Sequence, residues 1–245
     1  MIIYGKNPVT EYLTHRKSDV IKLFSCDDKT KSFFENNFKI NVCKTDQKFF
    51  YSKLKSNNIN HQNILAEIEM TNIMDIDELI IQTLSPKNKN KILLVLDHIS
   101  DPQNFGAIIR SAVFFNIAGI IIAKDRQTPI NSTVIKTSSG MSALAKFSVV
   151  PNIANTIQKL KQHNFTVYSA VKDCGCSPEE INVSSPIVLI VGSEGDGIQK
   201  NVLKLSDFYV SIKGSKSVES LNVSVSTAIL LYQISSNINS MSGGK

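Results

Sequence analysis

The sequence predicts an α/β protein made of a small N-terminal α/β unit and a larger C-terminal unit built on a parallel sheet. The composition, with 42% hydrophobic and 20% charged residues among 245, is that of a globular protein with a real core. Short strand-like and helical stretches alternate up to Ile68. Beyond Lys91, longer apolar runs alternate with helical patterns, which is typical of a parallel sheet covered by helices on both faces.

The N-terminal unit opens with a predicted helix near Tyr4–Thr14. Asn7 is expected to cap this helix, and Pro8 to occupy its first turn, where a missing N–H costs nothing. The elements expected next are the strands Val20–Ser25 and Ile40–Cys43 and the helices Lys31–Asn37 and Phe49–Asn57. We expect the unit to end near Ile68.

A boundary between two domains is expected between Asn72 and Asn90. Asp75 followed by Glu78 is typical of a helix N-terminus, and the polar stretch Ser85–Asn90 has the composition of a linker. We therefore predict a first domain over residues 1–72, a linker over 73–90, a second domain over 91–240 and a flexible tail over 241–245.

The C-terminal unit shows five strand-like runs and five helical patterns. The predicted strands are Ile92–Leu96, Gly119–Ala123, Thr166–Val171, Ile187–Val191 and Phe208–Ile212. The predicted helices are Asn104–Asn116, Thr133–Ala145, Ile153–His163, Gln199–Leu205 and Val223–Asn237.

Composition also limits where the protein works. Every apolar run is shorter than the roughly 18 residues needed to cross a bilayer, and no signal-like segment begins the chain. The four cysteines are expected to be reduced thiols. Cys174 and Cys176 are separated by one residue, which does not match a familiar zinc motif. We expect a cytoplasmic protein with no membrane partner and no metal.

The charge balance favours a polyanionic partner. The chain carries 27 basic and 21 acidic side chains, a net charge of +6, and its sequence pI is near 9.0. Only three of the basic residues are arginines. One of them, Arg110, is the sole charged residue between Pro102 and Ala123.

A first candidate motif follows the strand that opens the C-terminal unit. It runs from Asp97 through Asn104 and Gly106 to Arg110 and starts at the carboxyl end of a parallel strand, where open α/β sheets bind ligands. Helical side chains lean toward the N-terminus, so Arg110 is expected to lie across Gly106. The alternative is that Arg110 pairs with Asp97 or Asp101 as a structural ion pair.

Two further motifs follow later strands. Gly192-Ser-Glu194-Gly-Asp-Gly197 has three glycines in six positions, which permits positive φ and a close approach of the backbone to a nucleotide-type ligand. It matches neither a dinucleotide-binding fingerprint nor a P-loop, and it could be a tight turn only. The segment from Ser220 through Asn222 to Ser226 places small polar residues at a helix entrance, where they could simply be an N-cap.

Taken together, the three motifs resemble the SpoU, or TrmH-type, RNA ribose 2′-O-methyltransferases of the SPOUT class. Their order and spacing agree over residues 92–237. The N-terminal unit is similar to the L30e-like substrate-binding domain of the bacterial subgroup that methylates a guanosine of 23S rRNA. Tyr4-Gly5 and His61-Gln62 are the shared landmarks.

This resemblance implies a trefoil knot in the C-terminal domain, S-adenosylmethionine as cofactor, RNA rather than DNA as substrate, and a homodimer. It implies that Arg110 grips the phosphate beside the target ribose and, once engaged, acts as base. Asn104, Glu194, Ser220 and Asn222 would orient the reacting groups. The implied cofactor-binding residues are Gly192, Glu194, Gly197, Ile212 and Leu221.

Two departures from the family pattern and two alternative functions stay open. Asn63 replaces the usual glycine after His-Gln, a mild change because Asn tolerates left-handed backbone. Lys213-Gly-Ser-Lys216 replaces the usual Pro-Met-x-Gly, which affects the shape of the adenine pocket. The chain could instead be a tRNA-directed or antibiotic-resistance methyltransferase, or a non-catalytic RNA-binding assembly factor.

Aromatic rings of the N-terminal unit are candidates for RNA contact because lysines are interleaved with them. Rings at such spacings more often belong to the core, and that alternative stays open. The candidates are Phe33, Phe34, Phe38, Phe49, Phe50 and Tyr51.

Overall fold

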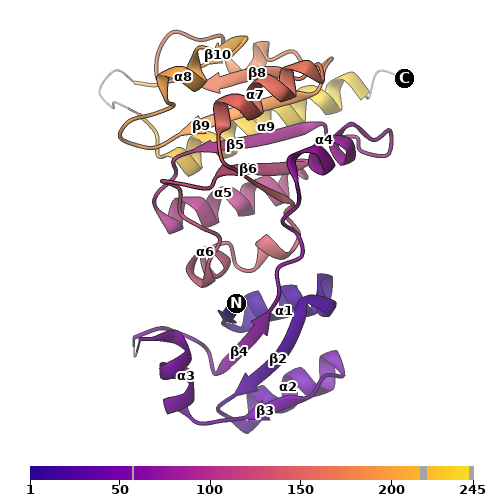
Figure 1. Ribbon diagram of the computed structural model, residues 1–245, viewed down its shortest axis with the longest axis vertical. Helices are drawn as coiled ribbons and strands as arrows, with labels where there is room; N and C mark the ends of the chain where they lie inside the picture. The colour runs from indigo at the N-terminus through magenta and orange to yellow at the C-terminus, as the bar shows by residue number, and fades with distance from the viewer. Residues whose placement is uncertain (57, 216–219, 243–245) are drawn as a thin grey trace. The chain divides into compact units, whose positions relative to one another are not determined.

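The computed structural model describes residues 1–56, 58–215 and 220–242, which form two compact units (Figure 1). Unit 1 comprises Met1–Asn72 together with Ile130–Leu144, and unit 2 comprises Ile73–Pro129 and the chain from Ala145 onward. Among the described residues, no helix combines the length and apolar character that a membrane crossing requires.

Unit 1 has a four-stranded sheet in the order β1-β4-β2-β3. Strand β4 is antiparallel to both β1 and β2, whereas β3 is parallel to β2. The strands are β1 (Ile2–Tyr4), β2 (Val20–Ser25), β3 (Val42–Lys44) and β4 (Ile64–Ile68). The helices are α1 (Lys6–His15), α2 (Asp28–Phe38), α3 (Gln47–Leu54) and a short 3₁₀ turn, Lys17–Asp19.

The start of α1 corrects one prediction. Its N-cap is Gly5, not Asn7, and Pro8 is the third residue of the helix. Gly5 has φ 95°, a left-handed conformation that favours glycine, and the backbone N–H of Lys6 donates to Gln62 Oε1 at 2.9 Å. A free amide at the start of the helix is therefore satisfied by a side chain from another part of the unit.

Residues 130–144 were predicted to lie in the second domain, but they group with unit 1. They form α6 (Ser132–Thr137) and a 3₁₀ turn, Met141–Ala143, instead of one helix over Thr133–Ala145. Gly140 separates the two with φ 87°, and a Cβ there would lie 2.7 Å from Pro8 Cα. Asn72 Nδ2 donates to the Ser142 carbonyl at 2.7 Å in a buried position. The chain thus passes between the units three times.

Unit 2 contains a sheet of six described strands, all parallel, in the order β10-β8-β9-β5-β6-β7. The predicted parallel sheet is confirmed. The strands are β5 (Ile92–Asp97), β6 (Gly119–Ala123), β7 (Phe147–Val150), β8 (Thr166–Ala170), β9 (Ile187–Gly192) and β10 (Phe208–Val210). The sequence prediction missed β7, a strand of four residues in which the buried Ser148 interrupts the apolar run.

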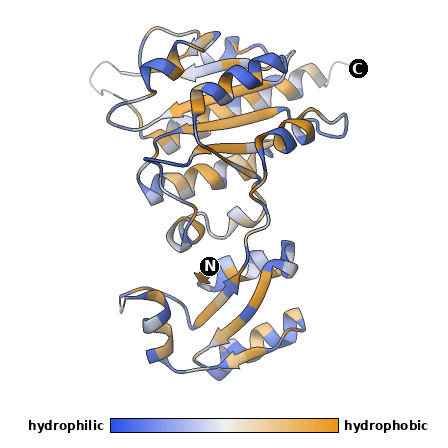
Figure 2. Ribbon diagram, viewed as in Figure 1, coloured by the Kyte–Doolittle hydropathy of each residue, from blue (hydrophilic) through white to orange (hydrophobic). Residues whose placement is uncertain are grey.

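Helices cover both faces of this sheet, and its central strands are strongly hydrophobic (Figure 2). One face packs with α4 (Ile76–Leu84), α7 (Ile153–Gln162) and α8 (Lys200–Leu203). Helices α5 (Pro102–Phe114) and α9 (Val223–Ser242) pack on each other and contact β6 and β9. A further 3₁₀ turn spans Pro178–Glu180.

The segment predicted as a linker is largely part of unit 2. Leu79 and Ile80 of α4 are buried in the core, and a Cβ at Gly119 would lie 2.6 Å from Leu79 Cδ1. The Met74 amide donates to the Phe147 carbonyl at 2.9 Å. Of the predicted tail, residues 241 and 242 complete α9, and 243–245 lie outside the described residues.

Candidate functional site

The carboxyl ends of β5 and β9 lie side by side at the point where the strand order reverses. Strands β6 and β7 extend the sheet on one side of β5, and β9, β8 and β10 extend it on the other. Asp97 at the end of β5 is paired with Gly192 at the end of β9. Open α/β sheets bind ligands at such a switch point.

A cluster of three polar side chains forms at this edge, and we call it the Asn222 cluster. Asn222 Nδ2 donates to Asn104 Oδ1 at 2.9 Å and to Glu194 Oε1 at 2.5 Å. The three residues are separated by up to 118 positions in the sequence. Each comes from one of the three predicted motifs, so the structure brings all three motifs together.

Asn222 serves both of the roles that the sequence left open. Its Oδ1 accepts from the Ser224 amide at 2.9 Å and from Ser224 Oγ at 2.6 Å, which caps the start of α9. Its Nδ2 is thereby directed at the other two members of the cluster. The N-cap thus fixes the orientation of the site amide.

Asn104 is held by the first turn of α5. Asp101 caps this helix by accepting from the amides of Gln103 and Asn104, both at 3.1 Å, and Pro102 occupies the first turn. Asn104 is 8% exposed. Its side-chain oxygen therefore has a fixed position in a largely buried setting.

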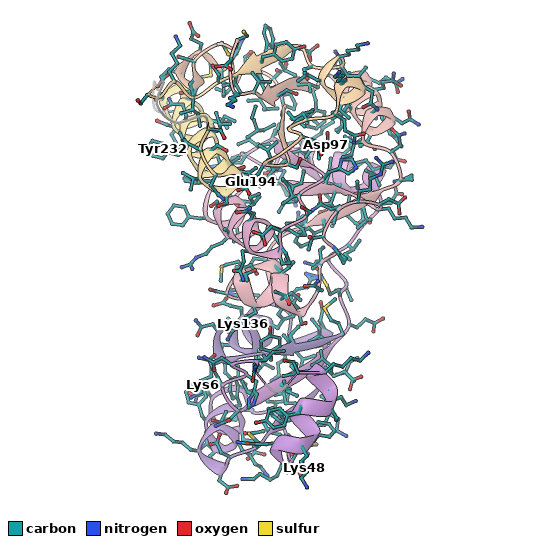
Figure 3. The ribbon with its side chains drawn as sticks, turned by 90° about the vertical axis from the view of Figure 1, so that its left-hand side faces the viewer. Lys6, Lys48, Asp97, Lys136, Glu194 and Tyr232 are labelled. Atoms are coloured by element: carbon teal, nitrogen blue, oxygen red, sulfur yellow. The ribbon has the colours of Figure 1, made fainter. Side chains whose placement is uncertain are left out.

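Glu194 lies on an exposed turn between Ser193 and Gly197 (Figure 3). The Ser193 and Gly197 backbones exchange hydrogen bonds of 3.2 and 3.0 Å, and Gly197 has φ 67°. At Gly192, a Cβ would lie 2.1 Å from the Gly197 carbonyl carbon. The first glycine is thus required by the turn's own backbone.

Asp97, which opens the first motif, is a positioning residue, a role that the sequence did not predict. It is fully buried, and it accepts from the Gln199 amide at 2.7 Å, from Gln199 Nε2 at 2.9 Å and from His98 Nδ1 at 2.5 Å. These bonds hold the chain directly after the Glu194 turn against the end of β5. The acidic residue at the end of an apolar strand could have indicated this role. Its partner Gln199, however, lies 102 residues away in the sequence.

Arg110 is exposed on α5, and its side chain forms no hydrogen bond or ion pair with any described residue. The alternative of a structural ion pair is wrong, because Asp97 bonds to Gln199 and His98 while Asp101 caps the helix. The guanidinium is therefore free to meet an anion from solution.

The other predicted site residues form no hydrogen bond with the Asn222 cluster within the described chain. Ser220 is exposed, Leu221 is 46% exposed and Ile212 is half-buried. A Cβ added at Gly195, Gly197 or Gly214 would meet nothing within 4 Å, so open space borders these glycines. The segment 213–216 differs from the family pattern, and its last residue, Lys216, lies outside the described residues.

The landmarks of the N-terminal unit also meet. Gln62 Oε1 accepts from Lys136 Nζ at 3.2 Å, and this ammonium lies 5.8 Å from the centre of the Tyr4 ring. Burial lowers the pKa of Lys136. Sequence analysis missed Lys136 because residues 130–144 were assigned to the other domain.

The turn before β4 adopts left-handed backbone, as Asn at position 63 was expected to allow. Asn63 has φ 62°, and its amide donates to His61 Nδ1 at 3.1 Å. His61 is 9% exposed and packs on Phe50, and this burial lowers its pKa. His61 is therefore part of the unit's core.

Comparison with known proteins gives the family. The model of the SpoU rRNA Methylase family matches residues 91–232, more than half of the chain. The chain belongs to the SpoU family. All three members of the Asn222 cluster and Arg110 lie in the part that the SpoU model matches.

Relatives of this SpoU protein carry related names. The "23S rRNA (guanosine-2'-O-)-methyltransferase RlmB" of Shewanella oneidensis is 30% identical over 241 residues, 95% of each chain. An "Uncharacterized tRNA/rRNA methyltransferase" of Borreliella burgdorferi is 44% identical over 154 residues, covering 62% of this chain and 67% of the relative.

Solved structures share the SpoU fold. AviRb of Streptomyces viridochromogenes, a SpoU methyltransferase crystallised with AdoMet, matches with a TM-score of 0.82 and 19% identity over 100% of this chain and 91% of its own. At this identity the match concerns the fold.

Proposed function

We propose that this protein transfers a methyl group from S-adenosylmethionine to the ribose 2′-hydroxyl of a guanosine in 23S rRNA, in the cytoplasm. Membership of the SpoU family and the RlmB relatives, three of which match over 95% of this chain, support the reaction class and the substrate. The observation that carries the proposal is the Asn222 cluster at the switch point of the sheet.

The residues at this edge fit S-adenosylmethionine. The open space beside Gly197 and Gly214 leaves backbone polar groups accessible to a ligand, while Ile212 and Leu221 offer apolar surface. Glu194 Oε2 forms no bond with the described residues, so it can receive a donor from the ligand. When bound, the cofactor supplies a methyl group activated on a sulfonium.

The chain's own residues position the other reactant. Arg110 binds the phosphate beside the target ribose with its planar fork, and its exposure leaves it accessible to RNA. Asn222 holds Asn104 and Glu194 in fixed orientations. Ser220 completes the polar lining. Orientation of the hydroxyl and removal of its proton are the two contributions that this transfer requires from a protein.

The protein acts as a homodimer with a trefoil knot in unit 2, in keeping with the resemblance. Exposed apolar side chains on α5 and α9 support the dimer: Phe114 is 81% exposed, Val225 47% and Tyr232, which is labelled in Figure 3, 60%. Sedimentation of Tyr232→Glu should show a monomer. Ile81→Glu, at a 71% exposed position of α4, is the control and should leave a dimer. A monomeric wild-type chain at micromolar concentration would contradict the dimer.

The function is tested by methyl transfer to RNA isolated from a strain that lacks the gene for this protein. Purified full-length protein with S-adenosylmethionine should methylate the ribose of a guanosine in 23S rRNA, located by mapping 2′-O-methylated nucleotides in rRNA and tRNA. Methylation confined to tRNA would support the tRNA-directed alternative; the name of the 44% identical relative, a tRNA/rRNA methyltransferase, covers both RNAs. Absence of methylation from both RNAs, in a chain that is folded, would overturn the proposal.

A further inference from the structure

A hollow of about 570 Å³ opens in unit 1 at the C-terminal end of α3, the helix labelled in Figure 1, and none of its described lining residues belongs to the Asn222 cluster. It is lined by Tyr51, Ser52, Lys55, Ser56 and Asn58. These described residues bring one aromatic ring, one ammonium, two hydroxyls and one amide, and none of them is acidic. This set of groups matches a nucleotide rather than an apolar ligand.

The aromatic ring of the hollow is held in place. Tyr51 is half-buried, its hydroxyl donates to Gln47 Oε1 at 3.2 Å, and its ring meets His61 edge to face with 6.2 Å between centroids. A ring fixed in this way loses little conformational entropy when a base stacks on it.

The ammonium of the hollow is available for a phosphate. Lys55 is the C-cap of α3, with φ 55°, and it is exposed. Its side chain forms no ion pair with any described residue. Ser56 Oγ accepts from the Asn58 amide at 3.3 Å, and the Asn58 side chain, which also lines the hollow, is exposed.

Charge concentrates in the unit that holds this hollow. Unit 1 contains twelve basic and eight acidic side chains, so it carries +4 of the chain's +6 on about a third of its residues. Lys48 and Lys53 are exposed on α3, and Lys53 lies 5.6 Å from the centre of the Phe49 ring. This surface attracts the RNA backbone.

The other aromatic candidates are less suited to contact RNA here. Phe34 and Phe50 are fully buried in the core. Phe33 is 50% exposed, but it lies on α2 and does not line the hollow. Tyr51 is therefore the ring that a base in this hollow would meet.

We propose that the hollow at the end of α3 binds an unpaired nucleotide of the RNA substrate, with its base on Tyr51 and its phosphate on Lys55. The inference rests on the proposed function and adds to it the part of unit 1 that recognises single-stranded RNA. Hydroxyl and amide groups of Ser52, Ser56 and Asn58 contact the base edge, which only an unpaired base exposes fully.

The experiment measures binding of the full-length chain to two fluorescein-labelled RNAs by anisotropy: a hairpin with a large unpaired loop and a blunt duplex of the same length. Tyr51→Leu should weaken hairpin binding by about tenfold, the scale of one lost base stack. Lys55→Gln should also weaken hairpin binding. It should reduce the slope of log K against log salt concentration by about 0.7, the value for one phosphate contact on a single strand.

Two variants are matched controls. Lys39→Gln removes an exposed lysine that is also a left-handed C-cap, at the end of α2 with φ 50°. Phe33→Leu removes an exposed ring of the same unit. Both should bind the hairpin within about twofold of wild type, because a single surface charge or ring outside the contact contributes little.

Equal losses in Lys55→Gln and Lys39→Gln, or wild-type affinity in Tyr51→Leu, would overturn the inference. So would an equal loss for hairpin and duplex, or a wild-type chain that binds neither RNA. Binding of S-adenosylmethionine, measured in the same samples, tests the proposed function separately. If Tyr51→Leu and Lys55→Gln bind both the cofactor and RNA like the wild type, the hollow is not an RNA-binding site. The proposed methyltransferase function would be unaffected by that result.

Discussion

The two units build their functional surfaces in different ways. In unit 2, Asn104, Glu194 and Asn222 meet through short side-chain hydrogen bonds, and the buried Asp97 holds the adjoining loop. In unit 1, exposed lysines and the half-buried Tyr51 ring lie on α3, which packs on a core that includes His61. Fixed geometry suits a reaction in which two groups must align, whereas a charged surface suits binding of a flexible polyanion.

This difference implies that the two units should respond to mutation in separable ways. Changes at the unit 2 edge should lower turnover or cofactor affinity. Changes in unit 1 should alter RNA affinity or local stability and leave cofactor affinity intact.

The largest effect is expected at Arg110. Arg110→Lys keeps the charge but loses the two-pronged grip on phosphate, so kcat for RNA methylation should fall by about a hundredfold or more. Melting temperature and S-adenosylmethionine affinity should barely change, because the side chain is exposed and has no bonding partner in the described chain. Turnover, calorimetry and thermal unfolding measure these three quantities.

Arg126→Lys is the control for that variant, since Arg126 is also exposed in unit 2. It should retain full turnover. Near-normal turnover in Arg110→Lys would remove Arg110 from the catalytic residues. It would also weaken the claim that changes in unit 2 lower turnover whereas changes in unit 1 alter RNA affinity.

The next effect is expected at the glycines of the Glu194 turn. Gly192→Ala places a Cβ about where the Gly197 backbone lies, so the turn must move and S-adenosylmethionine affinity should fall by about tenfold or more. The cause is displacement of the turn, not the filling of ligand space. Calorimetric titration measures the loss.

Gly195→Ala is the matched control, because a Cβ there meets nothing within 4 Å and the backbone φ is not positive. It should bind the cofactor with nearly the wild-type affinity. Equal losses in the two alanine variants would show that the turn's internal contact does not matter.

The smallest effect is a pH dependence of unit 1. The pKa of His61 is lowered from its ordinary 6.5, so the unfolded chain takes up the proton first as pH falls. The stability from neutral His61 is complete above pH 6.5 and is lost as pH falls toward the folded pKa, by at most about 1.4 kcal/mol per pH unit. Hydrogen exchange of unit 1 amides between pH 7.5 and 5.5 measures this loss.

Replacing the histidine identifies the source of that dependence. His61→Gln should remove most of the pH dependence over this interval, whereas His163→Gln, at an exposed position of unit 2, should leave it unchanged. An unaltered pH dependence in His61→Gln would assign it to other groups of unit 1.

Local pattern was sufficient for most of the unit 2 sheet. The strand Gly119–Ala123 has the predicted bounds, and β5 and β9 end one residue beyond the prediction. These strands were predictable because each is a continuous apolar run that is buried on both faces of the sheet. Strand β7 escaped detection because Ser148 breaks its run. The convergence of the three motifs followed from the rule that carboxyl ends of parallel strands share an edge.

Long-range contacts were beyond local pattern. Nothing near Asp97 in sequence indicates Gln199, and nothing in residues 130–144 indicates the packing of Gly140 against Pro8. Because residues 130–144 group with unit 1, the separate roles of the two units cannot be tested by simply cutting the chain at the predicted boundary. A fragment beginning at Lys91 would lose the buried Leu79 and Ile80 and would separate residues 130–144 from the rest of unit 1, so point variants in the full chain are the sounder test.

The most direct measurement for the central claim is calorimetric titration of S-adenosylmethionine into the full chain and into Asn222→Ala, without added metal. We expect micromolar binding to the wild type and a loss of at least about tenfold in the variant, because Asn104 and Glu194 lose their shared donor. RNA binding by unit 1 should be the same in both. A folded wild-type chain that binds no cofactor, or an Asn222→Ala variant that binds it as tightly as the wild type, would contradict the account.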